Sequence, residues 1–386
     1  MQALDTSSKF NPYLSTSQYD ASRSTFAEAF SPEHIRKRNR IAVLQLLFTH
    51  NTLSRANISK ILGLSKSSTS DVVNSLIEDN LIEECSEKII NGRGKPAISL
   101  RIIPNARQII TINVSRAEEL IGGISNLYSD IDENTLEIVH YKGELRAEVI
   151  IDLIKKLEAK LTAPLLGIGI SCPGAISDTG KIIQATNLGL ENYNLAQEIM
   201  PHISCPLRII NNANTAALGE SYLSNNYENL LYIFINRGVG AGMIINNQIV
   251  NGSHFTAGEI AHVIVDENGS MCSCGKRGCL ETIVSSPAIL RRIKADPTQR
   301  ERIVTNSGSL LGKVLALPVA VSGIDTVVID GNPETIDDTF IAAVDFEINS
   351  RVDAIFTPRI TIRRPHTKQR ISLIGLSVAV IRDVLE

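Results

Sequence analysis

The sequence lacks any run of about 18 uninterrupted apolar residues, which is the length that a membrane-spanning helix needs. Its first residues, MQALDTSSKFNPYLSTSQYD, also lack the basic and then apolar pattern of a secretory signal peptide. No internal repeat or long low-complexity tract is present. We therefore expect a cytoplasmic protein without a membrane partner, in which thiols stay reduced and disulfides are rare.

The chain has enough apolar material for two or three globular domains, since 43% of its 386 residues are hydrophobic and 20% are charged. Its net charge of −3 favours no particular class of partner. The charge is unevenly distributed, however. Residues 31–101 carry 11 basic and 7 acidic side chains, a net charge of +4, so the N-terminal part is electrostatically distinct from the rest.

Residues 1–31 are rich in Ser, Thr, Asn and Gln and predict a flexible arm, with a short docking segment as the alternative. A helical pattern follows, with one apolar stripe at three- and four-residue spacing: Ile41, Leu44, Leu47 and Phe48. The next segment, LSRANISKILGLSKSSTSDVVNSLIEDNLI, predicts two short helices joined by a tight turn at Gly63. Ser54 and Ser65 are the expected N-caps of these two helices.

Each of the two helices has an apolar side that is expected to face inward. On the first helix this side is made of Ile58, Ile61 and Leu62, and on the second of Thr69, Val72, Val73, Leu76 and Ile77. The stretch IEECSEKIINGRGKPAISLRI then predicts two strands around a basic, glycine-containing turn, which is a wing. Helix pair, wing and positive charge together favour a winged helix-turn-helix DNA-binding domain over residues 32–104, rather than an ordinary helical pair.

In such a domain the second helix enters the major groove of operator DNA. Its outward side chains can donate to and accept from base edges, and they are Lys66, Ser67, Ser68, Ser70, Asp71 and Asn74. Arg93 and Lys95 at the wing tip are expected to contact phosphates or a minor groove. Asp71 is a carboxylate near phosphate, so it accepts from a cytosine amine, pairs with a neighbouring cation or weakens binding.

From Gln108 onward short β-branched runs alternate with helical patterns. The expected strands are IITINVS, LLGIGIS, CPLRIIN, LLYIFIN, GMIINNQIV and DTVVIDG, and the helical segments between them include AEVIIDLIKKLEAKL and TAALGESYL. Alternation of this kind indicates α/β layers with more than one sheet over residues 105–386.

Three of the six cysteines fall within eight residues, in the stretch MCSCGKRGCL that begins at Met271. In a reducing compartment a tight cysteine cluster is more often a metal site than a disulfide framework. Unrelated buried thiols, or a redox pair of Cys272 and Cys274, are the alternatives. The stretch GEIAHVIVDENGSMCSCGKRGCLE, residues 258–281, resembles the ROK family of repressors, open reading frames and sugar kinases. The likeness extends over residues 35–281 and includes the helix-turn-helix segment and GRGKPA, which the family's kinases lack.

The resemblance implies an α/β body of two lobes of the actin and hexokinase type, with a sugar cleft between them. It also implies four ligands for structural zinc: His262, Cys272, Cys274 and Cys279. One imidazole and three thiolates suit tetrahedral Zn²⁺ and leave no open position for catalysis. Gly275 and Gly278 allow the tight backbone turn that brings the sulfurs together.

The same resemblance argues against catalysis. Family kinases use the Asp of an Asn-Asp-Ala-Asn stretch as the base, whereas this chain reads NNAN and has Asn212 there. A neutral amide cannot take the hydroxyl proton. The first phosphate loop falls at residues 113–116 without its acid and glycines, and the paired glycines near the nucleotide are reduced to Asp330-Gly331. Only NRGVGAG, residues 236–242, keeps a glycine-rich turn. We therefore expect that the chain is not an enzyme.

The sugar-binding positions that the resemblance implies are better preserved, and they are Asn211, Asn212, Glu259, His262 and Glu281. We therefore predict a sugar-responsive DNA-binding regulator, most simply a repressor of carbohydrate-use genes, that acts as a homodimer or tetramer. Two alternatives stand beside it. One is an active ROK sugar kinase that uses ATP, and the other is a regulator that responds to a protein partner.

Overall fold

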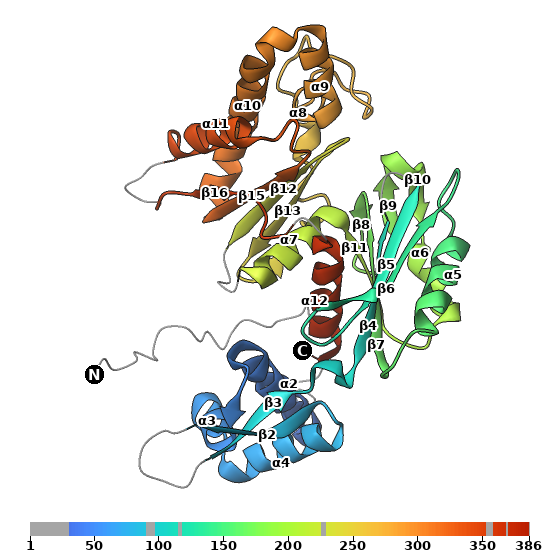
Figure 1. Ribbon diagram of the computed structural model, residues 1–386, viewed down its shortest axis with the longest axis vertical. Helices are drawn as coiled ribbons and strands as arrows, with labels where there is room; N and C mark the ends of the chain where they lie inside the picture. Colours follow the sequence, from blue (N-terminus) through green and yellow to red (C-terminus); the bar gives the residue numbers. More distant parts are fainter. Residues whose placement is uncertain are drawn as a thin grey trace.

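The computed structural model describes residues 31–89, 97–114, 118–224, 229–352, 358–367 and 370–385. It has three parts, which we call the head (31–102), the first lobe (108–211) and the second lobe (229–367) (Figure 1). Two further helices, α7 (Asn212–Leu223) and α12 (Ile371–Leu385), lie between the lobes. The predicted N-terminal arm, up to residue 30, and the wing-tip residues Arg93 and Lys95 lie outside the described residues.

The head has the helix pair and hairpin that the sequence predicts. Its elements are α2 (Pro32–His50), β1 (Leu53–Ser54), α3 (Arg55–Leu62), α4 (Lys66–Glu78), β2 (Ile82–Ile89) and β3 (Ala97–Ile102). Ser54 and Ser65 cap α3 and α4, since their hydroxyls accept from the backbone N–H groups three residues later at 3.2 and 3.1 Å. Gly63 ends α3 in the left-handed conformation, with φ of 65°.

One inward-facing prediction is wrong. Ile61 is 42% exposed, whereas Ile58 is fully buried and Leu62 is half-buried. On an eight-residue helix, positions 61 and 62 lie on opposite sides of position 58, and the core of the head lies on the side of Leu62. The inner face of α4 matches the prediction, with Thr69, Val72, Val73 and Leu76 buried.

The first lobe is built on a five-stranded sheet in the order β11-β7-β4-β5-β6. Strands β7 and β11 run parallel to β4, while β5 and β6 are antiparallel to their neighbours. Helices α5 and α6 and a small sheet of β8, β9 and β10 complete its core. The bounds are β4 (Gln108–Val114), β5 (Glu119–Ser125), β6 (Ile131–His140), α5 (Ala147–Glu158), β7 (Leu165–Cys172), β8 (Ala175–Ile176), β9 (Ile182–Ala185), β10 (Leu190–Tyr193), α6 (Leu195–Ile199) and β11 (Leu207–Asn211).

The second lobe is built on another five-stranded sheet, in the order β14-β13-β12-β15-β16, and helices cover both of its faces. Helices α10 and α11 pack on one face, where Leu231 and Ile233 of β12 lie; Tyr232, between them, faces α7 on the other. The bounds are β12 (Leu230–Ile235), β13 (Val239–Ile245), β14 (Gln248–Ile249), α8 (Glu281–Val284), α9 (Ser286–Ala295), α10 (Arg300–Ser322), β15 (Thr326–Gly331), α11 (Asp338–Asn349) and β16 (Thr361–Arg363).

The helical segment 297–322, which contains α10, is long and apolar enough by composition to cross a membrane. Its inner face, however, lies in the core of the second lobe, where Leu311, Leu315 and Val319 are fully buried. This face of α10 is therefore that of a core helix, while Leu317 and Val321 of the same helix are exposed.

The two lobes meet where α7 crosses α12. A Cβ atom on Gly375 of α12 would lie 1.8 Å from the carbonyl oxygen of Thr215, and one on Gly219 of α7 would lie 2.3 Å from that of Ile371. The two backbones are therefore in direct contact, at a distance that only glycine permits. Helix α7 belongs to the second lobe, since its fully buried Glu220 accepts from Arg363 and from the backbone of His366.

Helix α12 packs instead on the first-lobe sheet and reaches the head. Ser125 of β5 donates to Ser377 at 2.8 Å, and a Cβ atom on Gly169 of β7 would touch Leu376 at 3.0 Å. Further along, Val380 and Ile381 lie in the same hydrophobic cluster as the head residues. Figure 1 shows α12 running from the α7 crossing toward the head.

We expect Gly375→Ala to lower the free energy of unfolding by about 1–3 kcal/mol, because the added methyl group must push two helix backbones apart. Urea or thermal unfolding measures this loss. Gly240→Ala is the matched control, since its Cβ would meet only Ala213 at an ordinary 3.5 Å. Equal stability of the two variants would contradict the close crossing.

Candidate functional site

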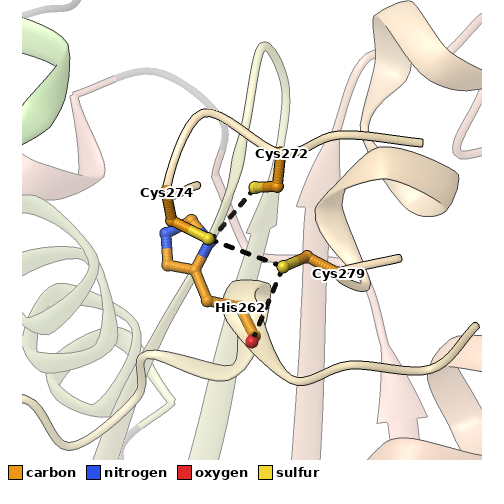
Figure 2. A group of neighbouring side chains, drawn as sticks. All are labelled: His262, Cys272, Cys274 and Cys279. Carbon is orange, nitrogen blue, oxygen red and sulfur yellow. Dashed lines mark hydrogen bonds between the residues drawn. The ribbon is translucent and has the colours of Figure 1, made fainter. Parts of the chain in front are cut away.

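The predicted metal ligands lie together in the second lobe. His262 ends the short 3₁₀ helix η4 (Ile260–His262), and the three cysteines come from the loop before α8. The four ligand atoms all lie within 4.8 Å of one another, and the side chains point toward a common centre (Figure 2). Cys272 Sγ is 3.5 Å from His262 Nδ1, and Cys274 Sγ is 3.6 Å from Cys279 Sγ. Four ligands tetrahedrally placed around zinc would be separated by about 3.6–3.8 Å, so the donor set fits such an ion.

Two glycines shape this loop. Gly275 and Gly278 have φ values of 86° and 68°, in the region that favours glycine. A Cβ atom on Gly278 would lie 1.4 Å from the carbonyl oxygen of Asp266, so no other residue fits there without moving the backbone. Isolated β-bridges join Met271 to Arg277 and Ile264 to Cys279, which folds the loop back onto itself. The backbone thus brings the sulfurs together, as the glycine spacing predicted.

The thiols differ in acidity. The backbone N–H of Lys276 lowers the pKa of the exposed Cys274 thiol, because it stabilises the thiolate. Burial and the neighbouring sulfurs raise the pKa of Cys279 to about 12. At neutral pH the Cys279 sulfur therefore needs a nearby cation to become a thiolate, and a bound metal ion supplies that charge. The cluster could hold a metal ion.

Asparagines surround the start of α7, at the carboxyl end of the first-lobe strand β11. Asn211 is the N-cap: its Oδ1 accepts from the backbone of Ala213 and Asn214 at 2.7 and 3.2 Å, and its Nδ2 donates to the carbonyl of Gly174 at 2.8 Å. Asn212 donates from Nδ2 to the carbonyl of Val114 at 3.0 Å. Its Oδ1 is buried and has no hydrogen-bond partner among the described residues, and the same holds for Oδ1 of Asn214.

The carboxylates approach from the second lobe, around the start of β13. A Cβ atom on Gly242 of β13 would lie 2.3 Å from the carbonyl oxygen of Ala213, and one on Gly258 would lie 2.1 Å from that of Ala241. The strand therefore packs between the start of α7 and the loop that carries Glu259. The backbone N–H of Val239 donates to Glu281 at 3.0 Å, while Glu259 is exposed.

The predicted sugar-binding residues therefore lie on the two elements that flank β13: Asn211 and Asn212 at the start of α7, and Glu259, His262 and Glu281 in residues 258–281, which we call the metal loop. Two hollows of the described surface lie elsewhere. One lies between α5 and α6, where Glu148 and His202 are among the lining residues, and the other lies beside the metal loop, near Ile264 and Arg277. Among these polar groups Glu259 is exposed to solvent, whereas the Oδ1 atoms of Asn212 and Asn214 are buried.

The residues at the expected nucleotide-binding positions form hydrogen bonds with other residues of the protein. Asn113, at the first phosphate-loop position, accepts a hydrogen bond from the hydroxyl of Ser171 at 2.6 Å. Asp330, which takes the place of a glycine, is almost fully buried and accepts from the hydroxyl of Tyr232 at 2.9 Å. Burial, the Asp330 charge and this hydrogen bond all raise the pKa of Tyr232, so the phenol stays protonated and keeps donating.

The predicted DNA-reading residues lie on α4. Lys66, Ser67, Asp71 and Asn74 are exposed, whereas Ser68 and Ser70 are half-buried. Ser68 is also within 2.8 Å of the capping hydroxyl of Ser65, so its side chain serves the helix start. In the described part of the chain Asp71 makes no ion pair.

Sequence reasoning missed one residue next to this surface, Arg55. It is the first residue of α3, and its guanidinium contacts Asn74 of α4 and Glu84 of β2. Its position at the start of the first helix could have identified it from the sequence. This helix of a helix-turn-helix crosses the DNA backbone, and a basic residue there suits contact with phosphate.

A helix-turn-helix head on a kinase-like body of two lobes, with a His-Cys₃ cluster in the second lobe, defines a class of DNA-binding regulators built on a sugar-kinase fold. The family model described as "ROK family" matches residues 132–382, and the chain belongs to that family. This confirms the resemblance and the fold class expected from the sequence.

Named relatives and solved structures agree with this family assignment. The chain is 30% identical to the xylose repressor of Bacillus subtilis (strain 168) over 271 residues, which are 67% of this chain and 69% of the repressor. It is 26% identical over 390 residues to the transcriptional dual regulator NagC of Escherichia coli (strain K12), covering 91% and 94% of the two chains. A ROK family transcriptional regulator, described as a homologue of the E. coli MLC protein, superimposes with a TM-score of 0.79 at 21% identity, covering 91% of this chain and 97% of the other. A ROK hexokinase from Thermus thermophilus matches with a TM-score of 0.61 at 20% identity, over 72% and 99%.

We expect the purified protein to carry about one tightly bound divalent metal ion per chain, measured by elemental mass spectrometry after dialysis. Cys279→Ser should remove most of it, because a hydroxyl is a poor metal ligand. Cys85→Ser is the control, since this half-buried thiol of β2 lies in the head. A wild-type protein without metal would show that the four side chains form only an apolar and hydrogen-bonded cluster.

Proposed function

We propose that the chain is a sugar-responsive repressor of carbohydrate-use genes, which binds operator DNA as a homodimer or tetramer in the cytoplasm. The observation that carries this proposal is the placement of α7. Its first turn holds the polar groups of the cleft, and its last turn contacts the part of the first lobe that packs on the head. One helix of 12 residues thus spans the distance between a ligand site and a DNA-binding unit.

The cleft suits a sugar because it offers unpaired acceptors. A buried carbonyl oxygen without a partner costs about 1–3 kcal/mol, which a sugar hydroxyl would recover by donating to it. The Oδ1 atoms of Asn212 and Asn214 are such acceptors. Glu259, Glu281 and His262 belong to the second lobe, as α7 does, whereas Asn211 ends the first-lobe strand β11, so a sugar held by both sets would bridge the two lobes and favour their closure.

The metal in this proposal is zinc in a structural role. Four protein ligands complete its tetrahedron and leave no position for substrate. His262 faces the cluster through Nδ1, which lies 3.5 Å from Cys272, so its other ring nitrogen stays available for a ligand hydroxyl. The ion would thereby fix the orientation of one sugar-binding residue.

We further propose that the kinase-like body does not catalyse. Phosphoryl transfer to a hydroxyl needs a group that can accept its proton, and Asn212 at that position is an amide. Asn212 also donates to the carbonyl of Val114, so its side chain has a structural role. The relatives described above as xylose repressor and NagC are named as regulators, which supports the same reading.

The proposed path from the sugar site to the head runs through three aromatic residues. Tyr222, in the last turn of α7, donates to the carbonyl oxygen of Tyr128 at 2.9 Å. The ring of Tyr128 packs edge-on against Phe48 of α2, with ring centroids 6.0 Å apart. A shift of α7 with the second lobe would therefore move the turn on which the head rests.

Helix α12 supplies a second connection. Three consecutive residues near its end contact three different parts: Ile381 lies in the hydrophobic cluster of the head, Arg382 donates to Asn247 of the second lobe at 2.8 Å, and Asp383 pairs with Arg208 of the first lobe at 2.9 Å. Burial raises the pKa of Asp383 and the Arg208 charge opposes this rise. The head therefore senses the angle between the lobes through this helix.

We expect one sugar to change the affinity for operator DNA several-fold, which corresponds to a coupling of about 1–3 kcal/mol. Fluorescence anisotropy with upstream DNA fragments at fixed salt measures it, against a panel that starts with xylose, N-acetylglucosamine and glucose. Glu259→Ala should abolish the response and spare DNA binding, while Glu267→Ala, an exposed control on the same loop, should change neither.

Other outcomes of this experiment are decisive. Tight DNA binding that no sugar alters would favour a protein partner as the effector. Sugar-dependent release of ADP from ATP would favour the kinase. Binding to DNA that stays nonspecific would contradict the assignment of the head.

Tyr222→Phe should weaken the coupling while leaving sugar affinity almost unchanged, because it removes one hydrogen bond, worth about 0.5–1.5 kcal/mol, outside the cleft. The ratio of DNA affinities with and without sugar measures the coupling. Tyr193→Phe is the control, since that hydroxyl donates to Glu198 on the first lobe. Unchanged coupling in Tyr222→Phe would rule out this path.

A further inference from the structure

A bidentate contact of Arg55 joins three elements of the head. From the start of α3, its Nη1 donates to Oδ1 of Asn74 on α4 at 2.9 Å, and its Nη2 donates to Oε1 of Glu84 on β2 at 3.0 Å. The planar guanidinium is therefore held by a helix and by a wing strand at the same time.

Asn74 belongs to the outward stripe of α4. The buried positions of this helix are Thr69, Val72, Val73 and Leu76. The opposite side carries residues at positions 67, 70, 71 and 74, which follow the spacing of one helical face. In the proposed DNA complex this side faces the bases of the major groove.

The contact decides which atoms Asn74 offers to a base. A free asparagine amide has both an acceptor and a donor, and it pairs with adenine by accepting from N6 and donating to N7. Because Oδ1 of Asn74 already accepts from Arg55, the amide is oriented with this oxygen toward α3 and Nδ2 pointing away. Asn74 then directs its N–H donors away from α3, and these match the two acceptors of guanine, O6 and N7.

We propose that Arg55 determines base specificity through Asn74, by orienting its amide so that the N–H donors face the base and select guanine over adenine at one position of each half-site. The proposal rests on the DNA binding proposed above. Arg55 acts here as a positioning residue, and the base is touched by Asn74.

Glu84 has a part in this arrangement. An exposed arginine beside DNA is strongly attracted to phosphate, and the Arg55–Glu84 pair is only partly screened from water, with side chains 31% and 44% exposed. The carboxylate of Glu84 offers Arg55 a competing partner and repels phosphate from the same place. Without that charge, Arg55 would be free to leave Asn74 and contact the DNA backbone.

The test is selection of bound duplexes from a random-sequence pool by the full-length protein at fixed salt, followed by sequencing. Asn74→Ala identifies the base position that Asn74 reads, since preference is lost there alone. Wild type should prefer guanine over adenine at that position by about 5- to 150-fold, the usual discrimination of a good base contact. Arg55→Met should reduce this ratio and admit adenine, with other positions unchanged.

Two further variants separate this role from a merely structural one. Arg101→Met removes the same charge from the same domain, but Arg101 pairs with Glu83 on the hairpin, so base preference should not change. Glu84→Gln should also admit adenine, and it should steepen the dependence of log affinity on log salt by about 0.9, the value for one added phosphate contact.

The outcomes are distinguishable. If wild type selects no sequence, the proposed function and this inference fail together. If wild type selects a site and Arg55→Met keeps the guanine preference at the Asn74 position, DNA binding stands and the role of Arg55 is refuted. Loss of preference at every position in Arg55→Met, together with a lower melting temperature, would mean that Arg55 only stabilises the head.

Discussion

The contact between the backbones of α7 and α12 is the constraint on which the rest of this structure depends. It exists because Gly219 and Gly375 have no Cβ, and any larger side chain would overlap a carbonyl oxygen of the other helix. Each helix is fixed to a different lobe, α7 by the buried Glu220 and α12 by Ser377 and Leu376. The angle between the lobes is therefore the angle between two helices in direct contact, and interfaces packed this closely favour a few discrete arrangements over continuous deformation.

The two helices also extend to the places where a signal would begin and end. The start of α7 carries Asn212, one of the proposed sugar-binding residues. The end of α12 lies in the hydrophobic cluster of the head. The metal loop lies near the start of α7. Gly258 and Glu281 hold this loop against β13, and β13 packs on the start of α7.

Local features of this chain were predictable from sequence, and features that depend on distant packing were not. The capping roles of Ser54 and Ser65, the turn at Gly63 and the cysteine loop around Gly278 each depend on a few neighbouring residues. The exposure of Ile61 depends on which side of α3 the rest of the head covers, and a periodic pattern does not specify this. Likewise, the contact of Arg55 with Asn74 and Glu84 joins residues 19 and 29 positions apart, which no spacing rule connects.

The most direct test of this account is reciprocity between the two sites. If the α7–α12 contact couples cleft and head, the DNA must change the affinity for sugar by the same factor by which the sugar changes the affinity for DNA. Calorimetric titration of the responsive sugar into the protein, alone and saturated with operator DNA, measures this factor. The account predicts two affinities that differ several-fold and in the matching direction. Equal sugar affinities for free and DNA-bound protein would contradict it.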